Sequence, residues 1–303
     1  MTGSLLALLT IEIGIDPTIG EVVGLLLTWH GVFTAVGIGG GVWAAVLVGR
    51  RLGFIDDDIY SAALIAIPFG IVGARGLFVV ERWGTSGIDD IVDIFRLNEG
   101  GISIYGAVLG GFLGGLIYGW FRKLPLRRGL DVAAVGLVLG MAIGRIGDII
   151  NGEHFAKVSS LPWAVRYTHI DSPSVLAHPE CGLGTQLGTS VHDLCAQHPA
   201  VAYEMLGDFL IFGLLLLAVL YVRRDGVAFF GFLLVYSLMR FGVSELRIDS
   251  REIIAGLTTP QVTALFLIPP SLLGLIYCLR SPEAEAPATG QPVPAPATGP
   301  PVR

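Results

Sequence analysis

The chain has 303 residues, of which 53% are hydrophobic and only 15% are charged, and its mean hydropathy is +0.71. Soluble globular proteins carry about 25% charged residues, so this composition excludes an ordinary soluble enzyme, a coiled coil and a disordered protein. The formal net charge of -6 provides no basic footprint for nucleic-acid binding. A membrane protein with several spans remains.

The first twenty residues contain an apolar run that lacks the marks of a signal peptide. No basic residue precedes it and no small-residue cleavage site follows it. We therefore expect an interfacial helix here.

Seven later apolar runs are long enough to cross a hydrocarbon core of about 30 Å, which needs roughly 20 residues per helix. The runs are unbroken, which favours helices over the alternating strands of a barrel. We predict an all-α polytopic membrane protein with seven transmembrane helices and no internal repeat. The predicted spans are residues 22–48, 59–80, 101–121, 129–149, 201–222, 226–243 and 261–279.

Basic residues gather in alternate loops, which the positive-inside rule predicts to be cytoplasmic. They are Arg50, Arg51, Arg122, Lys123, Arg127, Arg128, Arg223, Arg224 and Arg280. The N-terminus is then outside and the C-terminus inside. We divide the chain into a transmembrane domain, residues 1–280, and a Pro- and Ala-rich cytoplasmic tail, residues 281–303, which we expect to be disordered. Residues 150–200 would form an extracytoplasmic cap on the first domain.

The three cysteines are too few for a disulfide framework or a metal cluster. Cys181 and Cys195 share the polar cap segment and either pair or remain free thiols, an alternative that the spacing leaves open. Cys278 lies in an apolar run, so we expect it to serve only in packing.

Three arginines lie inside apolar runs: Arg75 in GIVGARGLFVV, Arg145 in LGMAIGRIGDIINGE and Arg240 in LLVYSLMRFGVSE. A charge at the bilayer centre costs about 2.5 kcal/mol or more. Each arginine could pair with a buried acid or extend to the membrane interface. Alternatively, the three could converge to bind an anion, and the abundant anion at this depth is a lipid phosphate.

Arg145 is followed by further polar residues as its span ends. Asp148 is three residues away, a spacing that predicts a helical ion pair. Asn151 and Glu153 come next, and Gly152 between them permits a break from helix into loop. We expect both polar side chains at the mouth of a membrane cavity.

Two further candidates lie near the outer ends of their spans. Tyr105 follows a Gly pair in NEGGISIYGAVLGG, a pattern typical of close helix packing, and would present a phenol to the same cavity. His30, in TWHGVF, is the only histidine within an apolar span. It is either a hydrogen-bonded packing residue or a proton acceptor near neutral pH.

These motifs together resemble the prolipoprotein diacylglyceryl transferase family. The longest match is GRIGDIINGEHFAKVSSLPWAVRY, residues 144–167. TWHG, GARGLFV, NEGGISIYGAVLGG, HPAVAYE, YSLMRF and LTTPQ match in the same order, so the resemblance covers nearly all of residues 20–280. It implies a multi-pass enzyme of the bacterial inner membrane that transfers the diacylglyceryl group of phosphatidylglycerol to the lipobox cysteine thiol of preprolipoproteins, releasing glycerol phosphate. It implies no metal or cofactor, and we expect a monomer.

The resemblance also implies site residues. Arg145 and Arg240 match two essential arginines that hold the lipid phosphate, and Asn151, Glu153 and Tyr236 match polar positions around them. We add Arg75 and Asp148 as candidate headgroup-binding residues. The predicted catalytic set is His30, Tyr105, Arg145 and Arg240.

The chain departs from the family pattern at three of these positions. Tyr105 stands where the family usually has His, and His30 stands where it usually has Tyr. Our hypothesis is that both face one cavity and that His30 accepts the thiol proton, because an ordinary tyrosine pKa near 10 is too high. Asp148 replaces the usual Asn. These departures leave two alternatives, a related transferase with another lipid donor or acceptor, or a non-catalytic homologue.

Overall fold

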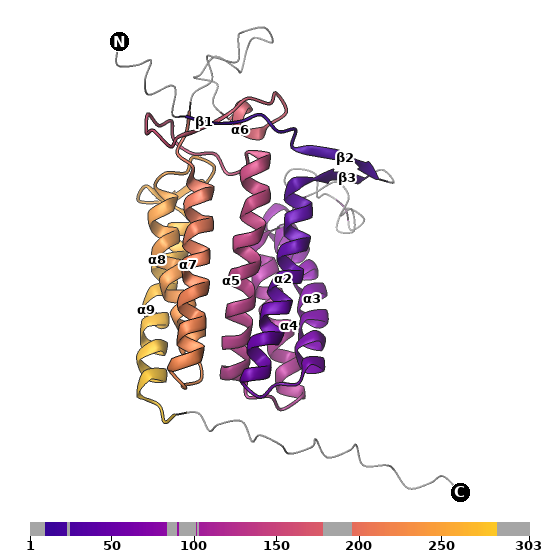
Figure 1. Ribbon diagram of the computed structural model, residues 1–303, viewed down its shortest axis with the longest axis vertical. Helices are drawn as coiled ribbons and strands as arrows, with labels where there is room; N and C mark the ends of the chain where they lie inside the picture. Colours follow the sequence, from indigo (N-terminus) through magenta and orange to yellow (C-terminus); the bar gives the residue numbers. More distant parts are fainter. Residues whose placement is uncertain are drawn as a thin grey trace, which may run out of the picture.

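The computed structural model describes residues 10–22, 25–83, 90, 101, 103–177 and 196–283. Within them, seven helices are long and apolar enough to span a membrane, and they stand side by side as a bundle (Figure 1). These helices are α2 (Trp29–Arg51), α3 (Asp56–Arg82), α4 (Ile104–Phe121), α5 (Leu126–Asn151), α7 (Ala200–Tyr221), α8 (Val227–Ser244) and α9 (Thr259–Arg280). The predicted fold class is confirmed.

Residues 1–9, which hold most of the apolar run expected to form an interfacial helix, lie outside the described residues. The described residues that follow form strands β1 (Ile11–Ile13) and β2 (Thr18–Val22). Strand β3 (Leu25–Thr28) pairs antiparallel with β2 and takes the residues predicted to begin the first span. Isoleucine and threonine favour strands, and Gly and Pro interrupt helices. Helix α2 begins only where the Thr28 side chain accepts a hydrogen bond from Gly31 N, at 3.1 Å.

Short elements cover one end of the bundle. Strand β4 (Val165–Tyr167) and helix α6 (Pro173–Leu176) lie in the segment between α5 and α7 (Figure 1). Strand β4 pairs parallel with β1. Strands β5 (Glu252–Ile254) and β6 (Leu257–Thr258) pair antiparallel before α9. Cys181, Cys195 and the tail from residue 284 lie outside the described residues, and the cap remains a prediction. Cys278 is buried, as expected.

Helices α2 and α5 pack with their backbones in close approach. A Cβ atom added to Gly37 would lie 2.5 Å from the carbonyl oxygen of Gly140, and one added to Gly41 would lie 2.5 Å from that of Gly136. Small residues allow this approach, and van der Waals packing then stabilises the helix pair. The pair brings the first turn of α2 against the last turns of α5, where a Cβ atom on Gly147 would lie 2.7 Å from His30 Cα.

We expect Gly41→Ala to destabilise the protein by about 1–3 kcal/mol, because the added methyl group forces the two helices apart. Gly39→Ala is the matched control, since no atom lies within 4 Å of a Cβ at Gly39 on the same helix. The measurement is thermal unfolding in detergent micelles. Equal midpoints for the two variants would contradict the packing role of Gly41.

A buried aspartate joins α5 to α8 at the end of the bundle opposite the strands. Asp131 is 4% exposed, and its carboxylate accepts hydrogen bonds from the backbone N–H groups of Gly226, at 2.6 Å, and Phe229, at 2.8 Å. Gly226 is the N-cap residue of α8 and Phe229 lies in its first turn, so neither N–H group has a partner within the helix. Asp131 therefore caps α8 from a neighbouring helix.

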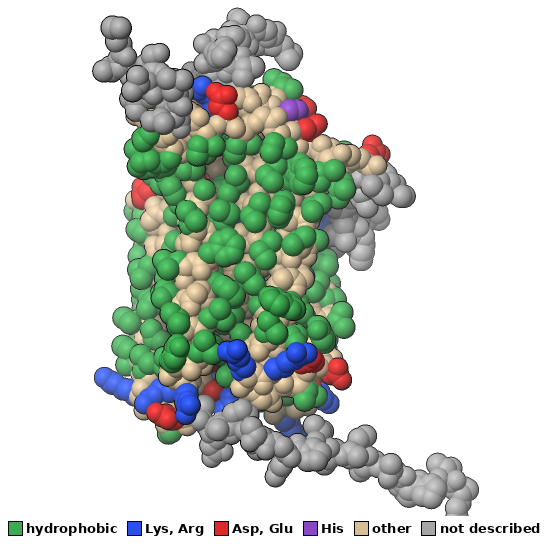
Figure 2. All heavy atoms as spheres, viewed as in Figure 1, with side chains coloured by type: hydrophobic (Ala, Val, Ile, Leu, Met, Phe, Trp, Pro, Cys, Tyr) green, Lys and Arg blue, Asp and Glu red, His purple; other side chains and the backbone are tan. Residues whose placement is uncertain are grey.

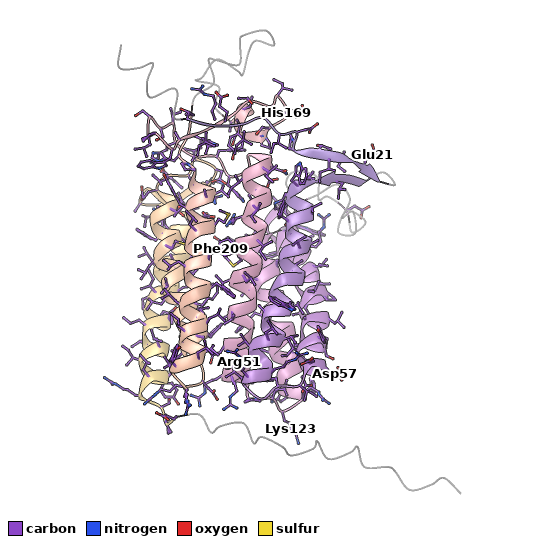
Figure 3. The ribbon with its side chains drawn as sticks, in the orientation of Figure 1. Glu21, Arg51, Asp57, Lys123, His169 and Phe209 are labelled. Carbon is purple, nitrogen blue, oxygen red and sulfur yellow. The ribbon has the colours of Figure 1, made fainter. Side chains whose placement is uncertain are left out.

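Charge is distributed unequally between the two ends of the bundle. Arg51 and Lys123 lie at one end, and Glu21 and His169 lie at the opposite end beside the strands (Figure 3). On the face that Figure 2 shows, hydrophobic side chains cover the bundle between the ends, and Lys and Arg gather at the end opposite the strands. This is the pattern of a bundle surrounded by lipid with its basic end in one compartment.

Candidate functional site

A single buried glutamate joins three arginines from three parts of the chain. Glu204, in the second turn of α7, is 1% exposed. Its carboxylate contacts Arg145 of α5 at 2.6 Å, Arg247 beyond α8 at 2.9 Å, and Arg240 of α8. Arg145 and Arg240 therefore pair with a buried acid, which was one of the two alternatives predicted for the intramembrane arginines. Because both pair with Glu204, these two arginines also converge on one point, as the other alternative predicted.

Arg145 continues the contacts towards α2. Its guanidinium donates to Asp148 Oδ2 at 2.9 Å, which confirms the ion pair predicted from the spacing of three. The other oxygen, Oδ1, lies 2.5 Å from His30 Nδ1. Asp148 is 4% exposed, so this carboxylate is buried between an arginine and an imidazole. The arrangement fixes the orientation of the His30 ring.

The loop after α5 adds the outermost groups. Gly152 ends the helix with φ +74°, a left-handed conformation that glycine adopts without strain. Asn151 is 4% exposed and donates from Nδ2 to Glu153 Oε1 at 3.0 Å. Glu153 Oε2 lies 3.6 Å from His30 Nδ1. The structure therefore brings Asn151 and Glu153 beside His30.

His154 and Asp249 close the other side of the site. Arg247 donates to Asp249 Oδ1 at 2.9 Å and Oδ2 at 2.5 Å. His154 Nδ1 lies 2.7 Å from Arg247 and 3.2 Å from Asp249, and its Nε2 lies 3.5 Å from Asp148. We call the connected set the polar network: His30, Arg145, Asp148, Asn151, Glu153, His154, Glu204, Arg240, Arg247 and Asp249.

Asp249 lies in the loop beyond α8, outside the membrane-spanning segments. Burial alone would raise the pKa of its carboxyl group, but the hydrogen bonds from His154 and Arg247 outweigh burial and hold that pKa below its ordinary value. Asp249 is therefore ionised at neutral pH and fixes the Arg247 guanidinium.

The remaining predicted residues have different contacts. Tyr236 lies against Phe232 in the core, with ring centroids 5.5 Å apart, and also contacts the Arg145 side chain. The Tyr105 hydroxyl lies 3.4 Å from Thr263 Oγ1 of α9. Arg75 donates to the Gly101 carbonyl oxygen at 2.8 Å and lies over the Phe78 ring. Tyr236 thus adjoins the polar network, and Tyr105 is close enough to Arg240 to interact with its charge. Arg75 makes its contacts with Gly101 and with Phe78 of its own helix, α3.

His30, Asp148 and Glu153 also offer ligand atoms that all lie within 4.8 Å of one another. Such a set has the chemistry to hold a divalent cation. However, Asp148 already bonds both His30 and Arg145, and a cation would have to displace these partners. The geometry favours a hydrogen-bonded network over a metal centre at this position.

Sequence reasoning did not select Glu204 as a site residue. The hydroxyl of its neighbour Tyr203 accepts a hydrogen bond from Trp163 Nε1 at 2.7 Å. The signal was present: Glu204 and Asp208 are acids inside an apolar run, four residues apart and therefore on one helix face. Applying to acids the argument used for arginines would have identified them.

The family follows from comparison with known proteins. The family model for prolipoprotein diacylglyceryl transferase matches residues 17–277. The chain belongs to this family. Among relatives named phosphatidylglycerol–prolipoprotein diacylglyceryl transferase, that of Clostridioides difficile is 30% identical over 254 residues, covering 84% of this chain and 92% of its own length. That of Symbiobacterium thermophilum is 31% identical over 279 residues, covering 91% and 97%. A Corynebacterium efficiens relative is 32% identical over 242 residues, covering 78% and 72%.

Membership of the prolipoprotein diacylglyceryl transferase family confirms the resemblance read from the motifs. The polar network lies within the matched residues, and the long 144–167 motif contributes five of its members: Arg145, Asp148, Asn151, Glu153 and His154. The longest stretch of the chain that resembles the family therefore supplies half of the polar network.

Proposed function

We propose that this enzyme binds the phosphate of phosphatidylglycerol between Arg145 and Arg240 and transfers the diacylglyceryl group to a lipobox cysteine. Its relatives are transferases that carry this reaction in their names, the first step of lipoprotein lipidation. One observation supports the assignment of the arginines above all others: both side chains are mostly enclosed, at 14% and 17% exposed, come from different helices and meet on one buried carboxylate. A site that holds a carboxylate between two guanidinium groups has the charge and donors to hold a phosphate.

The reaction needs two kinds of assistance. The cysteine sulfur attacks the carbon of the diacylglyceryl group that carries the phosphate. The bond from that carbon to the phosphate oxygen breaks, and glycerol phosphate leaves. Cations beside the phosphate stabilise the charge that develops on it. The thiol, whose ordinary pKa is about 8.5, must lose its proton to become a good nucleophile. Arg145 and Arg240 supply the first kind of assistance, and a base must supply the second.

His30 is the base in this proposal, and Asp148 positions it. Because Asp148 accepts a hydrogen bond from His30 Nδ1, the neutral ring keeps Nε2 as its free acceptor. The usual Asn would offer only a neutral amide here. The change to Asp148 and the change to His30 therefore support each other, and Tyr105 is left with a positioning role beside Thr263.

Asn151, Glu153 and Tyr236 contact the polar network and are proposed to surround the headgroup, and Arg75 remains a candidate contact for it. The basic end of the bundle supports an orientation with the polar network towards the outer face of the inner membrane, the N-terminus outside and the C-terminus cytoplasmic. A signal peptide in the membrane would then present its cysteine at the depth of the site. We propose that a monomer is sufficient.

The test is transfer by purified protein, incubated with phosphatidylglycerol vesicles and a lipobox peptide, with mass spectrometry to follow the diacylglyceryl adduct on cysteine. We expect an adduct with phosphatidylglycerol and none with a peptide whose cysteine is replaced by serine. An adduct formed only with another phospholipid would show a different donor. No adduct from folded protein, with an active family member beside it, would contradict the proposal.

A further inference from the structure

Glu204 holds the two arginines that the proposed function assigns to the lipid phosphate. Its carboxylate spans them, with Oε2 contacting Arg145 at 2.6 Å and Oε1 contacting Arg240. We infer that Glu204 occupies the position of the phosphate in the resting enzyme and that the incoming phosphate displaces it from both arginines. The inference rests on the proposed function and names a positioning residue for that reaction.

The chemistry of the two anions supports an exchange. Carboxylate and phosphate both accept paired, charge-assisted hydrogen bonds from guanidinium groups, so one can replace the other on the same donors. Arg145 and Arg240 lie on separate helices, and two unscreened cations this deep in the bundle would repel each other. The Glu204 carboxylate keeps them together before lipid arrives.

The contact between Glu204 and Arg145 is poorly aligned for a hydrogen bond, which favours its replacement by another anion. Oε2 is buried and takes no directed hydrogen bond from the described residues, although the Arg145 nitrogen is 2.6 Å away. The attraction is therefore that of an ion pair without good hydrogen-bond alignment. A phosphate oxygen that aligns better would gain more from the same guanidinium.

Arg247 gives Glu204 a partner after displacement. It contacts Oε1 at 2.9 Å and is 5% exposed, and Asp249 holds it through two hydrogen bonds. A buried carboxylate stripped of all its cations would be strongly destabilising. Because Arg247 is fixed by a separate acid, Glu204 releases Arg145 and Arg240 without becoming an unpaired charge.

This competition lowers the apparent affinity for the phosphate, because only the fraction of molecules with released arginines can bind it. Removing the carboxylate while keeping the side-chain shape should thus tighten binding. We expect Glu204→Gln to lower the Kd for inorganic phosphate by about tenfold, measured by calorimetry on the full chain in non-ionic detergent. The KM of Glu204→Gln for phosphatidylglycerol should also be lower than that of the wild type. A merely structural role would predict weaker binding.

Asp208→Asn is the matched control. Asp208 lies one turn further along α7, is 0% exposed, and neither of its carboxylate oxygens has a hydrogen-bond partner among the described residues. Removing this carboxyl group alters the same helix face without removing an ion-pair partner from either arginine. We expect its Kd for phosphate to equal that of the wild type. Tightening by both variants to the same degree would assign the effect to general charge and overturn the inference.

The outcomes separate this inference from the proposed function. If Arg145→Ala abolishes phosphate binding and Glu204→Gln does not tighten it, the displacement is refuted and the arginine site stands. If Arg145→Ala leaves phosphate binding unchanged, both fail. A second measurement needs no Glu204 variant: infrared difference spectra of the wild type should show a carboxylate band that shifts on adding phosphate, and absence of the shift would overturn the inference.

Discussion

Replacing Arg145 by alanine is expected to lower kcat/KM for diacylglyceryl transfer by about 100- to 1,000-fold, the loss typical of removing one donor from a charge-stabilising site. Arg145 is the only residue of the polar network that contacts both Asp148 and Glu204, so it links the proposed base to the proposed phosphate site. The measurement is the initial rate of adduct formation by mass spectrometry at several lipid concentrations.

Arg145→Lys is the control for this variant. It keeps the charge but loses the planar pair of donors, so a loss smaller than that of alanine is expected. Thermal unfolding must accompany the rates, because Arg145→Ala leaves two buried acids with one cation fewer. Full activity of folded Arg145→Ala would refute its role in transfer.

Replacing His30 by alanine is expected to lower kcat by about 100- to 10,000-fold, the range typical of general-base catalysis, with little change in KM. Asp148→Asn should cause part of the same loss, since the amide still bonds the ring but no longer stabilises its protonated form. The readout is the pH–rate profile, in which we expect the wild type to lose activity as His30 is protonated and His30→Ala to lack this acidic limb.

The exchanged positions supply a sharper comparison. The double variant His30→Tyr, Tyr105→His restores the usual family residues at both sites and should recover activity that His30→Tyr alone lacks. Recovery requires that the two side chains reach the same substrate. Full turnover by His30→Ala would dispose of His30 as the base.

Composition and hydropathy were sufficient to predict the bundle, because a helix that crosses lipid must be apolar over its whole length. The errors lie at the entry to α2, where strand-forming residues precede the helix without a change in hydropathy. Short-range spacing also predicted the ion pair of Arg145 with Asp148, which needs only the geometry of one helix.

The polar network as a whole was beyond such reasoning. His30 and Asp148 are 118 residues apart in the chain, and their contact depends on how α2 packs against α5. Glu204 contacts arginines from three segments of the chain, and the local sequence of each segment does not indicate which distant residues it contacts. The motifs indicated Arg145, Arg240 and Asp148 as candidates but not which residues they contact. The contacts of Glu204 depend on how α7 packs against α5 and α8.

The cap that Asp131 places on α8 also determines where the site arginines stand. Asp131 accepts a hydrogen bond from Gly226 N. Arg145 follows Asp131 by fourteen positions, and Arg240 follows Gly226 by fourteen positions. At about 1.5 Å per residue, both guanidinium-bearing residues lie about 21 Å from the anchored level. Helices α5 and α8 run in the same direction from the Asp131–Gly226 hydrogen bond. The Asp131 carboxylate, at the end of the bundle opposite the strands, therefore sets Arg145 and Arg240 at the same height along the bundle. An insertion of one residue in either helix between anchor and arginine would offset the two by about 1.5 Å and turn one of them by roughly 100°.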